Sequence, residues 1–266
     1  MSNLKFTLIQ TRLYWEDKEK NLSMLEEKVK ALRGTTHVIL LPEMFSTGFS
    51  MNPESLGEEM DGRSVQWMKT LAASQKCIIA GSLIIKENEN YFNRMIWMLP
   101  NGQFGIYDKK HLFAYAGEDR RYSPGNKRLI ASVNGWKLNL MVCYDLRFPV
   151  WARQQFHDDG SFEYDVLIYV ANWPEKRSTA WKTLLQARAI ENQCYVIGVN
   201  RVGTDGNEIY YSGDSMVIDP LGEILYHGSH DEDTTTITLN KDHLNEIRDK
   251  FPFWKDADDF IIPVQS

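Results

Sequence analysis

Apolar and polar residues alternate along the chain in two patterns, one typical of buried strands and one typical of amphipathic helices. Residues 4–9 form a short apolar run, which predicts a strand, and residues 17–32 place leucine and valine at every third or fourth position, which predicts a helix. Both patterns continue to the C-terminus. They predict further strands at 38–41, 77–85, 92–98, 103–107, 138–143, 166–170, 195–199, 217–218, 224–225 and 235–239, and further helices at 66–74, 148–156, 179–191 and 241–250.

The order of these elements predicts the class of fold. Two segments between apolar runs, Pro100-Asn101-Gly102 and Pro220-Leu221-Gly222, favour hairpin turns. Strands, helices and hairpins are mixed from end to end, and no linker, repeat or low-complexity segment divides them. We therefore expect an α/β protein with sheets covered by helices, folded as a single domain over residues 1–266.

The composition narrows the cellular setting and the partners. Hydrophobic residues make up 43% of the chain and charged residues 25%, as in ordinary globular proteins. The formal net charge of −6 offers no general attraction to nucleic acid or to anionic lipid, so we expect neither as a partner. No apolar stretch is long enough to span a membrane, and the first residues lack the apolar core of a signal peptide. Three cysteines without a CxxC pair indicate reduced thiols, which predicts a cytoplasmic protein.

Three predicted strands end directly in residues that can carry chemistry. The second strand is followed by Glu43, and the sixth ends in Cys143. The fifth is followed by Lys109, Lys110 and His111. Rigid scaffolds present functional groups at the ends of strands, so we expect these three strand ends to meet at one pocket.

Each of these residues has a structural as well as a functional interpretation. Cys143 is either a buried core thiol or, beside the charged residues that follow it, a thiolate nucleophile. Glu43 is either an ion-pair partner or a general base. The two lysines either extend into solvent or stabilise an oxyanion. His111 is either a hydrogen-bonded structural residue or the base of a Cys–His pair.

Taken together, the three segments resemble the nitrilase superfamily of carbon–nitrogen hydrolases. The likeness is carried by three motifs in the family's order and extends over essentially the whole chain. The motifs are Leu41-Pro42-Glu43-Met44-Phe45, Tyr107-Asp108-Lys109-Lys110-His111-Leu112-Phe113 and Val142-Cys143-Tyr144-Asp145-Leu146-Arg147-Phe148-Pro149. In this family the catalytic lysine stands two places before the histidine, which selects Lys109 over Lys110.

The resemblance implies a fold and a set of catalytic residues. The implied fold is a four-layer αββα sandwich with two mixed sheets flanked by helices. The implied nucleophile is Cys143, with Glu43 as the base, and Lys109 and the backbone N–H of Tyr144 as the donors to the oxyanion. A second family glutamate corresponds to Glu118. No metal or organic cofactor is implied, and the sequence itself shows no metal-ligand spacing and no glycine-rich phosphate loop.

Within the superfamily the chain is similar to the bacterial ω-amidases, which act on 2-oxo acid amides. The similar segments are Phe148-Pro149-Val150-Trp151, Ala171-Asn172-Trp173-Pro174 and His111-Leu112-Phe113 with Gly117-Glu118. This implies hydrolysis of the terminal amide of a 2-oxoglutaramate-type or 2-oxosuccinamate-type monoamide through a cysteine thioester. A nitrilase or an N-carbamoyl amidohydrolase would carry the same Glu-Lys-Cys triad, and a non-catalytic metabolite-binding relative is a further alternative.

An anionic substrate of this kind needs cationic partners, because burying an unpaired carboxylate is costly. Arg147 and Arg177 are the candidates, although each is equally open to a structural ion pair. Phe113, Tyr115 and Trp173 are the candidates for the walls of the pocket.

The C-terminal segments 251–254 and 260–262 carry more apolar residues than a free terminus should expose. They are expected to pack either on their own core or across a dimer interface. The family resemblance implies the second, a homodimer whose sandwiches pack back to back.

Overall fold

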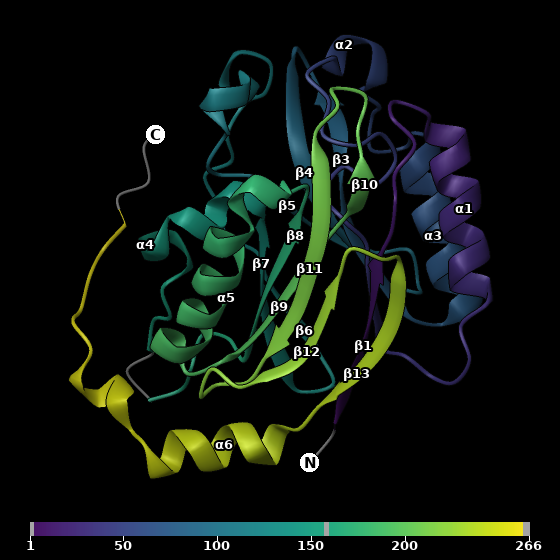
Figure 1. The fold of residues 1–266 in the computed structure, drawn as a ribbon. Helices are drawn as coiled ribbons and strands as arrows, with labels where there is room; N and C mark the ends of the chain where they lie inside the picture. The colour runs from purple at the N-terminus through teal and green to yellow at the C-terminus, as the bar shows by residue number, and fades with distance from the viewer. Residues whose placement is uncertain (1–2, 157–159, 263–266) are drawn as a thin grey trace.

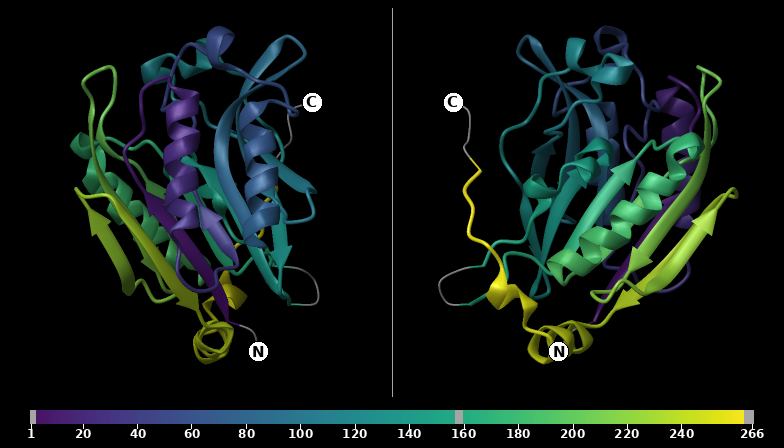
Figure 2. Two further views of the ribbon diagram at one scale, coloured as in Figure 1. Left: turned by 90° about the vertical axis from the view of Figure 1, so that its right-hand side faces the viewer. Right: turned by 60° about the vertical axis from the view of Figure 1, so that its left-hand side comes forward.

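The computed structural model describes residues 3–156 and 160–262 and contains two β-sheets that face each other, with helices on both outer surfaces (Figure 1). The left view of Figure 2 shows α1 (Lys18–Lys30) and α3 (Arg63–Gln75) side by side over the first sheet. The right view shows α5 (Ser178–Asn192) over the second sheet. The predicted αββα sandwich is therefore confirmed.

The strands of the first sheet follow the order β13-β1-β2-β3-β4-β5. The neighbours β1, β2 and β3 are parallel and the other pairs are antiparallel, so the sheet is mixed as predicted. The strands are β1 (Leu4–Gln10), β2 (Val38–Leu40), β3 (Ile78–Glu87), β4 (Asn90–Met98), β5 (Phe104–Asp108) and β13 (Asp233–Leu239).

The second sheet follows the order β10-β11-β9-β8-β7-β6, and β12 pairs with β11 beside this path. Here β7, β8 and β9 are parallel, and the remaining pairs are antiparallel. The strands are β6 (Ile130–Val133), β7 (Trp136–Val142), β8 (Val166–Ala171), β9 (Tyr195–Asn200), β10 (Val202–Thr204), β11 (Tyr210–Ile218) and β12 (Ile224–Ser229). The two sheets thus repeat one plan, with parallel strands at the centre and antiparallel strands at the edges.

The helices begin at positions that the local sequence favours. The side chain of Asp17 accepts a hydrogen bond from the backbone N–H of Lys20 at 3.1 Å, which satisfies one of the unpaired donors at the start of α1. The remaining helices are α2 (Pro53–Leu56), α4 (Pro149–Ala152) and α6 (Lys241–Lys250), with 3₁₀ turns η1 (Ala114–Ala116), η2 (Glu118–Arg120), η3 (Cys143–Arg147), η4 (Glu175–Arg177) and η5 (Phe253–Asp256). Among the residues described, no helix combines the length and the apolar character needed to cross a bilayer.

Strand β2 shows how the pleat of a strand divides the core. Val38 and Leu40 belong to the apolar cluster between the two sheets, whereas Ile39 and Leu41 belong to the cluster beneath α1 and α3. Successive side chains of a strand point to opposite faces, so a strand covered on both sides is apolar throughout. Full burial of each such side chain contributes roughly 1.5–3 kcal/mol, which holds the strand rigid up to the point where Glu43 follows it.

The structure departs from the sequence prediction in one helix and in several short elements. The helix predicted at 148–156 is wrong beyond its first turn, because α4 ends at Ala152. The backbone N–H of Gln154 bonds to Asn192 Oδ1 at 2.8 Å, and its side chain bonds to the backbone of Tyr164, so the chain turns away to meet α5 and the start of β8. Strands β6 and β10 were not predicted, since each has only three or four residues.

The apolar C-terminal tail packs in part on its own chain. The ring of Trp254 lies 5.2 Å from that of Phe156 and 5.6 Å from that of Phe162. Phe253 and Ile261 remain exposed. The first of the two predicted arrangements is therefore present for Trp254, and the dimer interface stays a prediction.

Candidate active site

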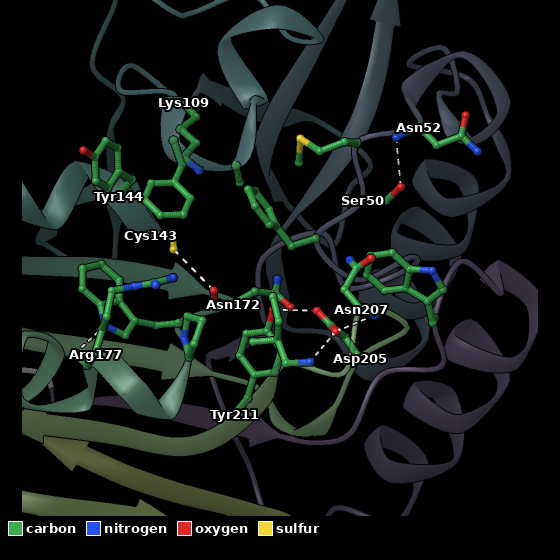
Figure 3. Close-up of a pocket in the computed structure, with 18 of the residues that line it drawn as sticks. Ser50, Asn52, Lys109, Cys143, Tyr144, Asn172, Arg177, Asp205, Asn207 and Tyr211 are labelled. Carbon is green, nitrogen blue, oxygen red and sulfur yellow. Dashed lines mark hydrogen bonds between the residues drawn. The ribbon is translucent and has the colours of Figure 1, made fainter.

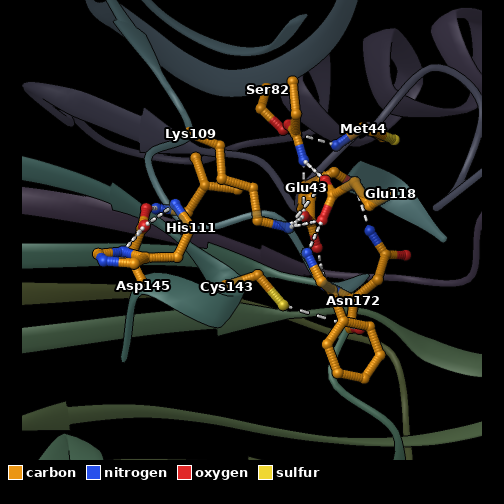
Figure 4. Close-up of polar contacts among 12 residues, drawn as sticks. Glu43, Met44, Ser82, Lys109, His111, Glu118, Cys143, Asp145 and Asn172 are labelled. Carbon is orange, nitrogen blue, oxygen red and sulfur yellow. Dashed lines mark hydrogen bonds and ion pairs between the residues drawn. The ribbon is translucent and has the colours of Figure 1, made fainter. Parts of the chain in front are cut away.

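The three strand ends singled out in the sequence meet in the structure, between the two sheets. Glu43 follows β2, Lys109 follows β5 and Cys143 follows β7 (Figure 4). Lys109 Nζ lies 2.9 Å from Glu43 Oε1, and neither side chain is exposed to solvent. The prediction that these motifs converge on one site agrees with this geometry.

A second carboxylate completes the surroundings of the lysine. Glu118 lies at the start of η2, and its two oxygens are 2.8 and 3.0 Å from Lys109 Nζ. Asn93 of β4 donates to both carboxylates, at 2.8 Å to Glu43 and 3.2 Å to Glu118. The backbone N–H of Phe113 also donates to Glu118, at 2.6 Å. Lys109 is therefore held in one position by two carboxylates that are themselves held in place.

The charges of this buried group act on one another. Burial by itself would lower the pKa of Lys109, but the adjacent charges of Glu118 and Glu43 outweigh it and raise that pKa above its ordinary value. Lys109 is thus an ammonium ion at neutral pH. Burial also raises the pKa of Glu118, and the charge of Lys109 opposes that shift only in part. A fixed positive charge in a site closed to water is well suited to stabilise a negative charge that develops during a reaction.

Cys143 stands at the turn between β7 and η3 in a strained conformation. Its φ is +45°, in the left-handed region that costs a residue other than glycine about 1–3 kcal/mol. The Sγ atom lies 3.9 Å from the backbone carbonyl oxygen of Asn172. Burial and the charge of Glu43 raise the pKa of the Cys143 thiol well above its ordinary value, against the opposing influence of Lys109. The resting thiol is therefore protonated and needs a base before it can attack.

A pocket of about 540 Å³ opens over this group, a volume within the usual range for small-molecule sites. Glu43 and Glu118 are buried behind Lys109. Figure 3 shows Cys143, Tyr144 and Arg177 on one side of the pocket, facing Ser50, Asn52 and Asn207 on the other. Its walls include Lys109 and Cys143, together with Phe113, Tyr144, Arg147 and Trp173.

The two candidate arginines both line the pocket. The guanidinium of Arg147 stacks 4.9 Å over the ring of Trp173, and that of Arg177 stacks 5.1 Å over the ring of Phe113. Within residues 3–156 and 160–262, neither arginine has a carboxylate within ion-pair distance. The structural ion pairs that the sequence left open are thus not observed there. Tyr115 is largely exposed and does not line the pocket, which corrects its assignment as a wall residue.

His111 is placed as a structural residue, and this decides between its two interpretations. Its Nδ1 lies 2.8 Å from Asp145 Oδ1, and its ring stacks on that of Phe148 at 3.9 Å. It does not line the pocket. Figure 4 shows the imidazole turned toward Asp145, whereas the Cys143 sulfur points toward Asn172.

Several residues of the site were not identified from the sequence. Asn172 directly follows β8, and its backbone N–H donates to Glu43 Oε2 at 2.8 Å. The strand-end rule that selects Glu43 also points to Asn172. Asn93 lies inside β4, where no local signal separates it from other polar strand residues. Glu16 and Asp205 reach the pocket from loops, and only the tertiary structure brings them there.

Within the residues described, no three histidine, cysteine or acidic side chains are grouped so that they could hold a metal ion. His227 and His230 lie outside the pocket, and His227 is part of β12. His227 bonds to Asp214 at 2.8 Å, and His230 bonds to Tyr210 at 3.1 Å.

Comparison with known proteins gives the chain a family. The sequence model of the carbon-nitrogen hydrolase family matches residues 5–249. The chain is 44% identical over 261 residues to omega-amidase YafV of Escherichia coli K12, covering 98% of this chain and 99% of that protein. It is 33% identical over 260 residues to 2-oxoglutaramate amidase of Bacillus subtilis 168, covering 95% and 98%.

A solved structure shows the same likeness in three dimensions. A CN-hydrolase superfamily protein from Xanthomonas campestris, which carries an arsenic adduct in its active site, superposes with a TM-score of 0.96 at 42% identity. The match covers 99% of this chain and 100% of that one. Nit3 of Saccharomyces cerevisiae, at 24% identity, shares the fold with a TM-score of 0.79. The chain therefore belongs to the carbon–nitrogen hydrolase family of the nitrilase superfamily.

Proposed function

We propose that this enzyme is an ω-amidase, which hydrolyses the terminal amide of small 2-oxo acid monoamides of the 2-oxoglutaramate or 2-oxosuccinamate type. The products are the dicarboxylate and ammonia. The observation that carries the proposal is that Cys143 and Lys109 face the same pocket as Arg147 and Arg177, two arginines without a carboxylate partner among the described residues. The names of the similar proteins, an omega-amidase and a 2-oxoglutaramate amidase, support the same activity.

The first half of the reaction forms a thioester. Glu43 takes the proton of the Cys143 thiol, and Sγ attacks the amide carbon. The oxyanion that forms is held by the ammonium of Lys109 and by the backbone N–H of Tyr144. The C–N bond then breaks, and Glu43 delivers its proton to the departing ammonia. Because the pKa of the free thiol is raised, this transfer to a neighbouring base is required at neutral pH.

The second half releases the acid. Water enters the place that ammonia has left, Glu43 takes one of its protons, and the oxygen attacks the thioester carbon. The same oxyanion donors stabilise the second tetrahedral intermediate. Its collapse breaks the C–S bond, and the proton on Glu43 returns to Cys143. Glu118 acts in both halves by holding the Lys109 ammonium at 2.8 Å.

The arginines account for the preference for an anionic substrate. A guanidinium binds a carboxylate through two parallel hydrogen bonds, and such charge-assisted bonds are about twice as strong as neutral ones. Arg147 and Arg177 each place the guanidinium carbon over an aromatic ring, and neither N–H fork is taken by a carboxylate among the described residues. We assign the substrate carboxylate to this wall, with Phe113, Tyr144 and Trp173 enclosing the carbon chain.

The test is ammonia release from a panel of small anionic amides, nitriles and carbamoyl compounds. The panel holds 2-oxoglutaramate and 2-oxosuccinamate, the corresponding ω-nitriles, and N-carbamoyl amino acids, with Cys143→Ala as the inactive control. We expect turnover of the two amides to exceed that of the other compounds by at least about tenfold in kcat/KM. Preference for a nitrile or a carbamoyl compound would instead assign the enzyme to that branch. If no compound releases ammonia while Cys143 is reduced, the result would favour a metabolite-binding protein over an enzyme.

We further propose that the enzyme works in the cytoplasm as a homodimer. The free cysteines Cys77, Cys143 and Cys194 support a reducing compartment. The dimer is supported by apolar side chains that remain about half exposed on α5 and at the β11–β12 hairpin, namely Ile190, Leu221, Ile224 and Leu225. Light scattering at micromolar concentration checks this, and a monomeric mass would exclude the dimer.

A further inference from the structure

A fully buried carboxylate that does not line the pocket lies two residues after the nucleophile. Asp145 belongs to η3, and no lysine or arginine lies within ion-pair distance of it in the part of the chain that the structure describes. Its Oδ2 accepts from the backbone N–H of Val142 at 3.0 Å and from Tyr107 OH at 2.7 Å. Its Oδ1 accepts from the backbone N–H of His111 at 2.9 Å and lies 2.8 Å from His111 Nδ1 (Figure 4).

These four donors come from the two segments that present the catalytic groups. Val142 directly precedes Cys143 at the end of β7, in the second sheet. Tyr107 and His111 stand on either side of Lys109, at the end of β5 in the first sheet. One carboxylate therefore ties the turn of the nucleophile to the loop of the lysine, across the space between the sheets.

The hydrogen bonds of Tyr107 show that its hydroxyl donates to Asp145. Tyr107 OH accepts from Trp151 Nε1 at 3.0 Å and from the backbone N–H of Lys110 at 3.3 Å. Both lone pairs of the phenol are thus used, so its single hydrogen points to Asp145. Burial and the charge of Asp145 raise the pKa of Tyr107 well above its ordinary value, which keeps that hydrogen in place.

The tie acts where the backbone is strained. The bond from Val142 N–H to Asp145 closes over Cys143, whose φ of +45° is unfavourable for a residue with a side chain. Such a conformation persists only where the surrounding structure imposes it. We propose that Asp145 is a positioning residue, which holds the Cys143 thiol in register with Lys109 and Glu43. The inference rests on the proposed roles of these three residues.

Two variants weaken the tie by different amounts. Asp145→Asn replaces one accepting oxygen by an N–H₂ group, which then faces donors instead of accepting from them. A displacement of the thiol by about 1 Å costs on the order of 10²-fold in rate, so we expect kcat to fall about that much while KM changes less than threefold. Tyr107→Phe keeps the carboxylate but removes the hydrogen bond from the phenol to Asp145, and it leaves Trp151 Nε1 and the Lys110 N–H without their acceptor. We expect kcat to fall roughly tenfold.

The chain offers matched controls away from the pocket. Asp219 is also a buried carboxylate, and it accepts from the backbone N–H groups of Leu221 and Glu223 and bonds to a histidine, His243. Tyr226 donates its hydroxyl to Asp233. Asp219→Asn and Tyr226→Phe therefore lower stability by the same chemistry, and we expect both to keep the parental kcat.

A second readout does not depend on the substrate. The rate at which iodoacetamide alkylates Cys143, followed by mass spectrometry, measures thiol activation directly, so a wrong substrate assignment leaves it intact. We expect Asp145→Asn to slow this reaction about tenfold, and we expect the same of Glu43→Gln. If Asp145→Asn does not fold, the Tyr107→Phe variant tests the positioning role of Asp145 by itself. The inference would be overturned if Tyr107→Phe keeps both the parental kcat and the parental alkylation rate. It would also be overturned if Asp219→Asn loses as much kcat as Asp145→Asn.

Discussion

Replacing Lys109 by methionine removes the one positive charge that separates two buried carboxylates. Methionine is unbranched and close to lysine in volume, so the change acts mainly on charge. The ammonium of Lys109 is 2.9 Å from Glu43 and 2.8 Å from Glu118. Each of these contacts is worth about 6 kcal/mol at an effective dielectric constant of ~20. Most of that sum is offset by the cost of burying the lysine itself, and breaking a buried pair of this kind typically costs a net of about 3–5 kcal/mol.

Activity falls for a separate reason. The variant lacks the donor that we assign to the oxyanion, and loss of one such donor lowers kcat by about 10²–10³-fold. The double variant Lys109→Met with Glu118→Gln separates the two effects, because it removes one of the two unpaired charges without restoring the donor. We expect it to recover about half of the lost stability and none of the lost activity.

The pH dependence of stability has a definite sign in Lys109→Met. The charge of Lys109 lowers the pKa of Glu118 in the parent, so its removal raises the pKa of that carboxyl further. A carboxyl whose pKa is raised on folding stabilises the protein below its unfolded pKa of about 4.3, and that stabilisation is lost as the pH rises through the folded value. The stability deficit of the variant is therefore largest near pH 8 and shrinks toward pH 5.

Urea unfolding followed by tryptophan fluorescence at both pH values measures the stability, and ammonia release measures kcat. Lys20→Met is the matched control, because Lys20 is exposed and pairs with the partly exposed Asp17 at 2.8 Å. Surface pairs contribute about 0–1 kcal/mol, so we expect little change in either measurement. A Lys109→Met variant that resembles this control in stability, or that keeps the parental kcat, would refute the electrostatic account of the site.

Three further predictions concern the thiol, the arginines and a close backbone contact. Because the pKa of the Cys143 thiol is raised on folding, the parent should lose stability more steeply than Cys143→Ala above a pH of about 8.5, by up to about 1.4 kcal/mol per pH unit in urea titrations. Arg147→Met and Arg177→Met should each raise KM for 2-oxoglutaramate roughly tenfold or more with a smaller effect on kcat, and unchanged saturation curves would remove that arginine from the carboxylate wall. Gly125→Ala would place a Cβ 2.1 Å from the carbonyl oxygen of Asp108, so thermal denaturation should show a loss of about 1–3 kcal/mol.

Local pattern was enough to predict sheets covered by helices and the strand ends that meet at the pocket, whereas the four layers were implied by the family resemblance. Strand β2 is apolar on both faces because sheets and helices cover both of its sides, and such a run is visible in one dimension. Glu43 can be identified from the sequence for the same reason, because it is the polar residue that follows this apolar run. The helix predicted at 148–156 failed because its end is set by Asn192, a partner 38 positions away from Gln154.

The order of residues alone showed which residue types stand at the strand ends, and through them the resemblance to the family and to its Glu-Lys-Cys motifs. Only the tertiary structure decided what each residue faces. His111 contacts Asp145, and Asn93 donates hydrogen bonds to two carboxylates. Arg147 has no acidic partner among the described residues. The physical reason is that hydrogen bonds and buried charges depend on distances between segments far apart in the chain, whereas hydrophobic periodicity is a property of neighbouring residues.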